Sequence, residues 1–400
     1  MKNTPDNFLT ETHRAALSPH ATDLTRKTFD GTYEVLKNAF ATPTAIGRGS
    51  ISGCLYRRDG TKVSASERFC GYRGDRVRNS NPEHTRFPDN AFYLGGRGVY
   101  LGHLMSGHYG HFIVETLSTF WLFEEIDARA FDYFLFHPFI FGSSIPEYAK
   151  IVFQRMQVDV ERVKVVGTEP ILMKEIVVPE RLVRLNHSAD RSLRRIYNRI
   201  ANVTGDSETP SRRVYISRRK LTAKSWNRVV ANEVAIEAVF KRFGFEILYP
   251  EKTPFKEQLK TYRDTAILAG PSGSGLHNSL FTREGTLVVE LGDPRYKGEP
   301  APTQKLCNYI AGSTTHFIPF RGIRFGPKKT MLFDLRHITA QLELVIVYAA
   351  QAPTFKFPGG SCSGGRYLRW NGLFEVAFRT ARPALGYLAR RLATLLRGRS

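Results

Sequence analysis

Apolar residues in the middle of the chain alternate between strand-like and helix-like spacing. Between residues 95 and 137, the apolar run RGVYL is followed by GHFIVETLSTFWLFEEI, which has helical spacing, and then by the aromatic run DYFLFH. A helical stretch from Pro146 precedes two more strand-like runs, RVKVV and ILMKEIVV. Strands that alternate with helices are typical of a parallel sheet covered on both faces. This part of the chain is therefore predicted to be an α/β domain.

A second block with the same alternation follows. Residues 190–202 have apolar side chains at helical spacing, and the segment VTGDSETP after them is rich in turn-forming residues. The strand-like runs RRVYIS, FEILY, TAILAG and TLVVEL then alternate with helical stretches, the first capped by Asn232 and ended by Gly244, the second opened by Pro254. This repeated unit predicts a doubly wound sheet. A last helix is expected over residues 334–348.

These patterns predict an α/β protein with two Rossmann-like domains facing a cleft. Residues 1–40 are expected to form a polar lead-in, residues 41–205 the first domain, residues 206–350 the second, and residues 351–400 a basic amphipathic C-terminal tail. The leucines and arginines of the tail suit the surface of an anionic membrane. A helix packed back across both domains, with its basic face in water, accounts for the same pattern equally well.

The composition favours a folded protein of the cell interior. Of the 400 residues, 42% are hydrophobic, which is enough to build cores, and the four cysteines have neither disulfide-framework nor zinc-site spacing. The N-terminus lacks the apolar segment of a secretory signal, and no uncharged apolar run approaches the ~20 residues that cross a bilayer. We therefore expect a cytoplasmic protein.

Positive charge is concentrated in two segments. The formal net charge is +21; residues 181–228 hold 13 basic and 3 acidic side chains, and residues 355–400 hold 9 and 1. Such concentration indicates anionic partners, namely nucleic acid, phosphate groups or an acidic membrane surface. Because no nucleic-acid-binding motif accompanies the charge, we expect phosphates and membranes as partners, and no nucleic acid.

A glycine-rich turn gives the strongest chemical signal. In TAILAGPSGSGLHNSLF, residues 265–281, an apolar strand leads into Gly273, Ser274 and Gly275 and then into a predicted helix. A helix start directs unpaired N–H groups at an anion, and glycines let a phosphate approach the backbone. The spacing matches neither the dinucleotide fingerprint nor a phosphate loop with lysine. A tight turn that uses glycine only for its backbone freedom is the alternative.

Charged residues are expected beside this turn. Arg218 and Arg219 follow the strand RRVYIS, with Arg228 shortly after, and parallel strands of a sheet end on the same side. The arginine fork can bind two oxygens of a diphosphate at once. Glu290 ends the next strand and is a candidate either to hold ribose hydroxyls or to pair with Arg295.

A histidine and a carboxylate stand together in the first block. His108, His111 and Glu115 occupy positions i, i+3 and i+7, on one face of the predicted helix near its start. A neighbouring carboxylate can orient an imidazole and adjust its pKa so that it acts as a general base. A packing histidine with a nearby helix-dipole partner is the alternative. A metal at this place would need a further protein ligand from elsewhere.

The order of these motifs resembles a known family. The segments GHFIVETL, RRVYISRR, RVVANE, GPSGSGLHNSLF and VVELG, within residues 103–291, resemble the glycosyltransferase family 61 proteins, the DUF563 group. His111 and Glu115 match the family's histidine and acid. The residues that match its later motifs are Arg218, Arg219, Arg228, Asn232, Glu233, Gly273, Gly275, Leu276, Asn278 and Glu290. This chain has Ser272 where many members have histidine, and His277 five positions later is a candidate substitute.

The resemblance implies a GT-B-like fold and inverting transfer of a sugar from a nucleotide sugar, with a UDP-sugar as the expected donor. For bacterial relatives it implies a role in capsular or surface polysaccharide synthesis, with a glycan or lipid-linked acceptor. His111 or Glu115 is then the candidate base, with His277 as a third candidate. The expected donor-binding residues are Arg218, Arg219, Arg228, Gly273, Ser274, Gly275, His277, Asn278 and Glu290.

Two further expectations concern the metal and the membrane. No Asp-x-Asp pair ends a predicted strand, so we expect catalysis without a divalent metal or other cofactor. A lipid-linked acceptor fits peripheral attachment of the basic tail to the inner face of the plasma membrane.

Two other classes of function are compatible with parts of the sequence. Gly270, Ser272 and Ser274 approach the nucleophile elbow of α/β serine hydrolases, with Asp293 and either His316 or His337 to complete a triad. That interpretation leaves the arginines and the first block unexplained. A non-catalytic protein that binds anionic glycans is the other alternative.

Overall fold

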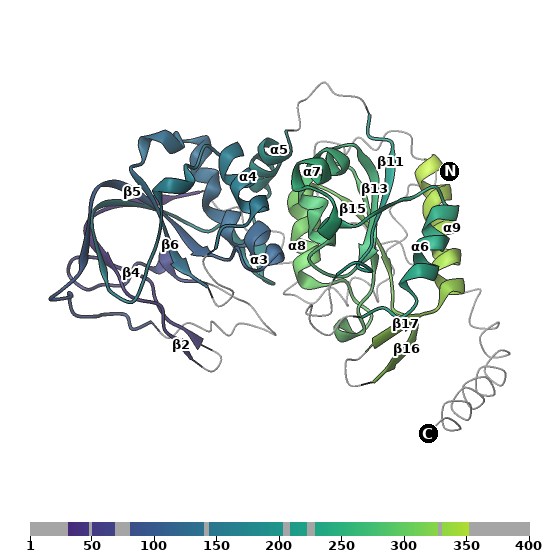
Figure 1. Ribbon diagram of the computed structural model, residues 1–400, viewed down its shortest axis with the longest axis horizontal. Helices are drawn as coiled ribbons and strands as arrows, with labels where there is room; N and C mark the ends of the chain where they lie inside the picture. The colour runs from purple at the N-terminus through teal and green to yellow at the C-terminus, as the bar shows by residue number, and fades with distance from the viewer. Residues whose placement is uncertain are drawn as a thin grey trace, which may run out of the picture. The chain divides into compact units, whose positions relative to one another are not determined.

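The computed structural model describes residues 31–47, 50–68, 81–139, 144–202, 209–221, 229–326 and 330–351. All of them belong to Met1–Tyr367, one of the two compact units into which the chain divides. Two main sheets organise the described residues, one between residues 33 and 179 and the other between residues 212 and 318 (Figure 1). The protein is therefore of the mixed α/β class, as predicted.

The first sheet is mixed rather than parallel. Its order is β4-β1-β8-β5-β6-β7. The strands are β1 (Tyr33–Ala41), β4 (Leu55–Tyr56), β5 (Phe92–Leu104), β6 (Tyr133–Pro138), β7 (Val163–Val165) and β8 (Ile171–Pro179). Strands β8, β5, β6 and β7 run parallel, whereas β1 is antiparallel to β8 and to β4. The prediction of a parallel sheet is wrong here because β1 comes from residues that were expected to form the polar lead-in.

The two faces of this sheet are covered differently. We call the part of the chain with the first sheet the first half and the part with the second sheet the second half. The main helices of the first half are α3 (Tyr109–Val114), the 3-10 helix η3 (Thr116–Glu124), α4 (Glu147–Arg155) and α5 (Arg194–Ala201). They pack on one face, with Phe134 and Val177 in the shared core. On the other face the sheet curls over itself, so that Leu135 and Val178 meet residues of β1 and β4 (Figure 1). The expectation of helices on both faces is therefore wrong for this half.

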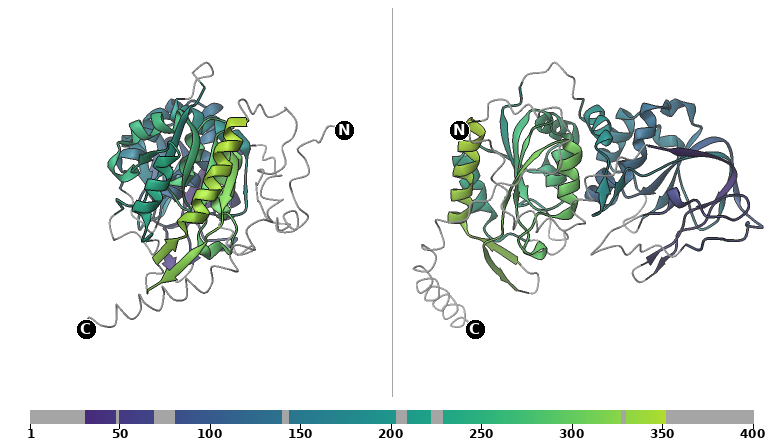
Figure 2. Two further views of the ribbon diagram at one scale, coloured as in Figure 1. Left: turned by 90° about the vertical axis from the view of Figure 1, so that its right-hand side faces the viewer. Right: turned by 180° about the vertical axis from the view of Figure 1, so that it is seen from behind.

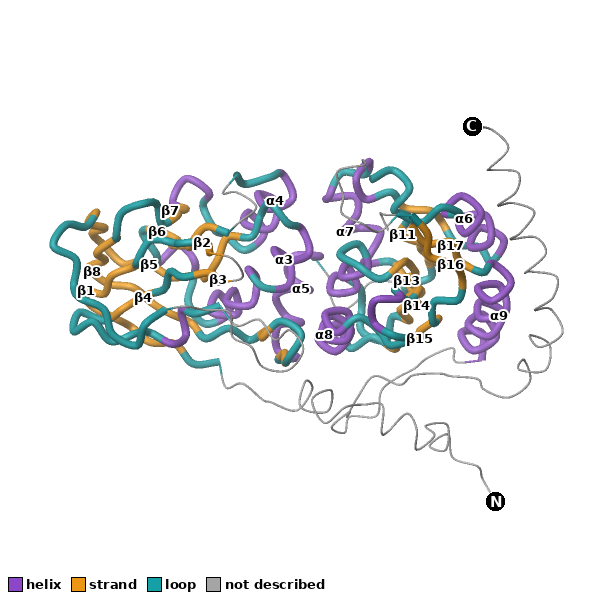
Figure 3. The backbone as a smooth tube through the Cα atoms, turned by 90° about the horizontal axis from the view of Figure 1, so that it is seen from below, coloured by secondary structure: helices purple, strands orange, loops and turns teal. Residues whose placement is uncertain are grey.

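The second sheet is parallel and doubly wound, as predicted. Its order is β12-β11-β13-β14-β15, and every neighbouring pair is parallel. The strands are β11 (Arg212–Ile216), β12 (Glu246–Leu248), β13 (Thr265–Pro271), β14 (Leu287–Leu291) and β15 (Thr314–Ile318). The helices are α6 (Glu233–Arg242), α7 (Phe255–Arg263), α8 (Pro302–Ala311) and α9 (Leu335–Gln351). Helices α6 and α9 lie side by side on one face, and α7 and α8 cover the other (Figures 2 and 3).

Alternating side chains of the second sheet enter two separate cores. On β13, Leu268 packs with α7 and α8, whereas the neighbouring Ala269 packs with α6 and α9. The α7–α8 core also contains Phe112 of α3 and Tyr197 of α5, which belong to the first half. The two halves therefore share one continuous hydrophobic core.

Two predicted helices are shorter and tighter than expected. The run after His108 forms α3, of six residues, followed by the 3-10 helix η3, and LHNSLF forms a six-residue 3-10 helix, η8 (Leu276–Phe281). In η3 the Thr116 hydroxyl donates to the His103 carbonyl at 2.9 Å, and the Ser118 hydroxyl donates to the Glu115 carbonyl at 2.6 Å. Hydroxyl groups that bond to the backbone compete with regular helical bonding, which favours short 3-10 turns.

Smaller elements complete the described part. They are β2 (Ile46–Gly47) with β3 (Ser50–Ile51), β9 (Val183–Arg184) with β10 (Ser188–Ala189), β16 (Gly322–Phe325) with β17 (Thr330–Phe333), and the 3-10 helices η2 (Ser64–Ser66), η4 (Ala128–Ala130), η5 (Val160–Arg162), η6 (Arg191–Leu193), η7 (Pro250–Lys252) and η9 (Pro294–Tyr296). Helix α9 confirms the helix expected over residues 334–348. Residues 203–208, where the domain boundary was placed, and the tail beyond residue 351 lie outside the described residues. Within the described part, each helix is too short or too polar to cross a bilayer.

Candidate functional site

The start of α3 holds the predicted histidine–carboxylate pair. His108 is the N-cap residue, and its ring accepts a hydrogen bond from the His111 backbone N–H at 3.4 Å. One helical turn brings Glu115 below His111, and the Nδ1 atom of His111 is hydrogen-bonded to Glu115 Oε1. Because a carboxylate only accepts, Nδ1 carries the proton in this bond.

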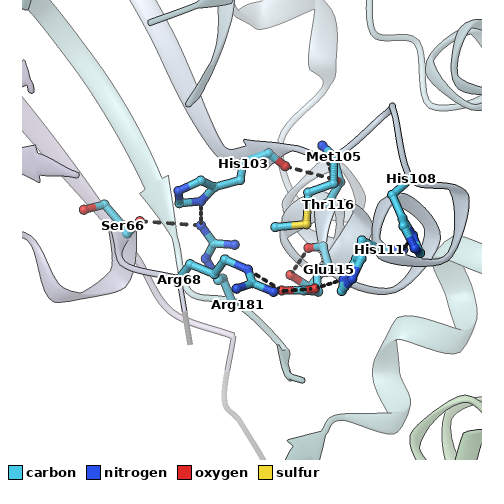
Figure 4. A network of polar contacts seen from close by, with 10 residues as sticks. Ser66, Arg68, His103, Met105, His108, His111, Glu115, Thr116 and Arg181 are labelled. Atoms are coloured by element: carbon cyan, nitrogen blue, oxygen red, sulfur yellow. Dashed lines mark hydrogen bonds and ion pairs between the residues drawn. The ribbon is translucent and has the colours of Figure 1, made fainter. Parts of the chain in front are cut away.

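Arg68 is the second partner of Glu115. Its Nε atom lies 2.8 Å from Glu115 Oε2 and its Nη2 atom 3.0 Å from Oε1, so the guanidinium grips the carboxylate with two bonds (Figure 4). The side chain of Glu115 is only 3% exposed. Burial alone would raise the pKa of Glu115, but the charge of Arg68 and the bond from His111 outweigh it and lower the pKa to about 2. Glu115 is therefore ionised at neutral pH.

A further arginine lies behind this pair. Arg181 is half-buried and donates from Nη2 to His103 Nδ1 at 3.1 Å (Figure 4). Burial, together with the charge of Arg181, holds the pKa of His103 well below its usual range, so this imidazole is neutral and able to accept. In the network of Figure 4, two guanidinium groups therefore stand beside a single carboxylate, which leaves an excess of positive charge.

The glycine-rich turn follows β13. Gly273 has a φ of 144°, in the region that favours glycine. The Ser272 hydroxyl donates to Glu290 Oε1, which also accepts from the Ala301 backbone N–H at 3.1 Å. Burial raises the pKa of Glu290 to about 7, against the opposing effect of these two bonds. Glu290 therefore ties the turn to the start of α8 from inside the protein.

The short helix η8 changes the expected anion site. The turn leads into a six-residue 3-10 helix instead of the predicted α-helix, so few aligned peptide dipoles stand behind Gly275. Within it, Asn278 accepts a hydrogen bond from the Tyr109 hydroxyl of the first half and donates to the Gly275 carbonyl at 2.8 Å. His277 Nδ1 lies 2.8 Å from Gln304 Oε1 of α8. The side chains of η8 thus connect the two halves.

Gly110 is where α3 meets this turn. A Cβ atom at Gly110 would lie 2.6 Å from Ser274 Oγ and 2.9 Å from Ser274 Cβ. Cβ atoms in proteins do not approach other non-bonded heavy atoms so closely. Only glycine lets α3 approach so closely. The approach closes one side of a pocket of about 140 Å³. The lining residues are His108, Gly110, His111, Leu185, Gly273, Ser274, His277, Tyr296, Ala301 and Thr303.

Two of the predicted arginines, Arg218 and Arg219, follow β11 at the same end of the second sheet but are not part of this lining. Arg219 donates to Glu237 Oε1 at 3.0 Å and to the Tyr249 hydroxyl at 2.7 Å. The Arg218 backbone N–H donates to Glu233 at 3.3 Å. Arg228 lies outside the described residues.

The structure thus brings together the predicted His111, Gly273, Ser274 and His277 around one pocket, with Glu115 directly behind His111. Sequence analysis missed Arg68, which stands far from the recognised motifs, and Gln304. A signal for Gln304 existed, because Gln304 and Asn308 are amides at i and i+4 that are both buried on an otherwise apolar face of α8. Buried amides need partners.

The serine-hydrolase alternative finds no support in this geometry. Ser272 is buried, and its hydroxyl donates to a carboxylate, Glu290. His316 instead pairs through Nε2 with Gln341 of α9 at 3.1 Å. An elbow serine must present its oxygen to a substrate.

Among the residues that the structure describes, no three or more histidine, cysteine, aspartate or glutamate side chains cluster in a way that suits a metal ion. Cys54 and Cys307 are buried thiols, and the other two cysteines lie outside the described residues.

The close approach at Gly110 leads to a first prediction. The substitution Gly110→Ala should lower the free energy of unfolding by about 1–3 kcal/mol, because the new methyl group overlaps Ser274. In the Ser274→Gly background the same substitution should be neutral or stabilising, since alanine is the better helix former. Urea unfolding of the four proteins measures both effects. Equal effects of Gly110→Ala in the two backgrounds would contradict the close contact.

The low pKa of Glu115 leads to a second prediction. A folded-state pKa below the unfolded value adds stability that is present above about pH 5 and is lost as the pH falls toward 2. With a pKa of about 2, this loss is about 3 kcal/mol in the wild type. The Glu115→Gln variant should lack this part of the pH dependence, as measured by urea unfolding at several pH values. Asp89→Asn, which alters an exposed ion pair, is the control that should keep the wild-type slope; parallel curves for Glu115→Gln and wild type would refute the ionised, buried carboxylate.

Comparison with known proteins agrees with the resemblance seen in the sequence. Residues 109–289 match the family model described as Glycosyltransferase 61. A search of curated proteins finds no match. The matched segment begins at α3 and ends in β14, so it contains His111, Glu115 and the glycine-rich turn. It supports a transferase that acts on a donor and an acceptor. The match over this segment supports a protein of the glycosyltransferase 61 family.

Proposed function

We propose that this protein transfers a sugar, with inversion, from a nucleotide-sugar donor to a hydroxyl group of a glycan or lipid-linked acceptor in bacterial surface polysaccharide synthesis. The observation that carries the proposal is the single pocket lined by His111 of the first half and by Gly273, Ser274 and His277 of the second. A base and a donor-binding turn must face the same reacting atoms, and this arrangement supports that requirement.

In the proposed reaction, the acceptor hydroxyl oxygen attacks the anomeric carbon while the bond from this carbon to the diphosphate oxygen breaks. The hydroxyl proton passes to Nε2 of His111, and the electron pair of the broken bond leaves with the diphosphate. Because Glu115 is ionised and bonded to Nδ1, it fixes the tautomer and stabilises the imidazolium that forms. We assign the base to His111 because the two oxygens of Glu115 are already held by Arg68 and His111.

The departing diphosphate needs positive charge. The excess of guanidinium charge around Glu115 lies directly behind the pocket wall and supports such a role. The proposed donor site further includes Gly275 and Asn278 of the turn, the segment of Arg218, Arg219 and Arg228, and Glu290, which acts through Ser272 and Ala301. We propose a UDP-sugar as the donor.

We also propose a GT-B-like fold for the protein and a place for it in the cell. A GT-B-like division of labour, with the acceptor on the first half and the donor on the second, is supported by the doubly wound second sheet, whose strands β13 and β14 end at the turn. We place the protein in the cytoplasm, with peripheral attachment to the inner face of the plasma membrane through the basic tail, residues 351–400.

Donor binding and base catalysis provide a third prediction. In a thermal-shift screen of UDP, GDP, CMP and their sugars, the true donor should raise the melting temperature, because a ligand of the native state stabilises it. With that donor, His111→Ala should lower kcat by about 10²–10⁴. His84→Ala, at an exposed histidine outside the pocket, is the matched control and should keep wild-type kcat. Donor binding without any effect of His111→Ala on transfer would point to a different base.

Metal dependence provides a fourth prediction. We propose that transfer needs no divalent cation, because the described lining of the pocket offers three histidines and no carboxylate to a hard cation such as magnesium. Activity should therefore survive addition of EDTA. Loss of activity with EDTA that manganese or magnesium restores would show that the assignment is wrong.

A further inference from the structure

His277 is a second histidine of the pocket, and the structure holds its ring in one orientation. It lies on η8, is 7% exposed and contributes to the lining opposite His111. Its Nδ1 atom is 2.8 Å from Oε1 of Gln304. When an imidazole contacts a substrate through one nitrogen, the hydrogen bond made by the other nitrogen determines which of the two carries the proton.

The orientation of the Gln304 amide is fixed by its other contacts. The Nε2 atom lies 3.2 Å from the Leu276 carbonyl oxygen, 3.0 Å from Ser279 Oγ and 2.7 Å from Asn308 Oδ1. A backbone carbonyl has no proton to give, so the atom that faces Leu276 must be the donating nitrogen of the amide. The amide oxygen then faces His277.

This orientation fixes the tautomer of His277. An amide oxygen only accepts hydrogen bonds, so Nδ1 of His277 must carry a proton. In the neutral ring, Nε2 is then an acceptor. The Nε2–Cδ2 edge is the edge opposite Nδ1, and Cδ2 would lie 3.4 Å from a Cβ atom at Gly110. The Cδ2 atom of this edge therefore lies against α3, and the His277 side chain is part of the pocket lining.

Two of the three histidines that line the pocket, His111 and His277, have different partners behind them. Behind His111 stands an ionised carboxylate, whereas behind His277 stands a neutral amide. The first arrangement suits a group that takes up a proton. The second suits a group that stays neutral and accepts a hydrogen bond.

We propose that Gln304 is a positioning residue that holds His277 as the Nδ1–H tautomer, and that Nε2 of His277 accepts a hydrogen bond from a hydroxyl group of the donor sugar. The hydrogen bond to the donor sugar rests on the proposed function, whereas the tautomer held by Gln304 does not. A site built to accept from a hydroxyl discriminates against ligands that lack it. His277 and Gln304 would then help to select the sugar.

The tautomer is tested on the ligand-free full chain by NMR of ¹⁵N-labelled histidine. The His277 signals are identified by their loss in His277→Phe. At neutral pH we expect a protonated Nδ1 and an unprotonated Nε2 in the wild type. A protonated Nε2, in either a neutral or a cationic ring, would overturn the proposal.

Variants of Gln304 test the cause. Gln304→Met should lose the fixed tautomer, and Gln304→Glu, which keeps an accepting oxygen, should keep Nδ1 protonated. Gln258→Met removes another buried glutamine amide, which bonds Tyr262, Pro250 and Thr253 away from the pocket, and should leave the His277 signals unchanged. An unchanged tautomer in Gln304→Met, or a changed one in Gln258→Met, would count against Gln304 as the positioning residue.

The role in sugar selection is tested by calorimetry with UDP-glucose, GDP-mannose or CMP-sialic acid, whichever binds, and the matching free nucleotide. Gln304→Met should weaken binding of the sugar nucleotide by roughly 3- to 10-fold, the range expected for one hydrogen bond, and leave binding of the free nucleotide unchanged. Equal losses for both ligands, or none, would refute the hydroxyl contact. If none of the ligands binds, the proposed function fails, and the NMR result still decides the role of Gln304.

Discussion

The arrangement of this site depends on a glycine, which has no side chain, at position 110. At Gly110 the backbone of α3 comes so close to Ser274 that a single methyl group would not fit between them. This contact places an imidazole from a curled mixed sheet beside a glycine-rich turn from a parallel one. Because neither half contains both groups, the chemistry of the pocket arises from tertiary packing rather than from either sheet alone. The Tyr109–Asn278 hydrogen bond joins the neighbouring residues and holds the same register.

Buried charge is organised around the pocket in a similar way. Glu115 remains ionised inside the protein because Arg68 supplies two hydrogen bonds and His111 a third. Glu290, in contrast, accepts hydrogen bonds from Ser272 and from the Ala301 backbone N–H, and burial raises its pKa to about 7. These two buried glutamates thus differ in pKa because the bonded guanidinium of Arg68 outweighs burial at Glu115, whereas the charge of Lys305 does not outweigh burial at Glu290.

The sequence predicted the second half better than the first. Strands β11 to β14 and helices α6 and α7 were evident, since each has a regular apolar period and a capping or breaking residue such as Pro254 or Gly244. Strand β1 was missed because its first residues are exposed and only Ala39 to Ala41 are buried. The pairing of His111 with Glu115 follows from helical spacing, whereas that of Glu115 with Arg68 spans 47 positions and no local rule contains it. The short helix η8 was mistaken for an α-helix because six residues have too little periodicity to separate the two.

The continuous core has a consequence for how ligands are exchanged. Phe255 of α7 packs against Tyr109 and Tyr148 of the first half, at ring-centroid distances of 6.1 and 6.2 Å, and Tyr197 packs against Phe281 at 5.7 Å. Separating the halves would expose these aromatic faces to water, which costs a free energy of about 25 cal/mol for each Å² of apolar surface exposed. Separation of the two halves is therefore costly, and a rearrangement confined to the rim of the pocket would admit a ligand at a lower cost in free energy.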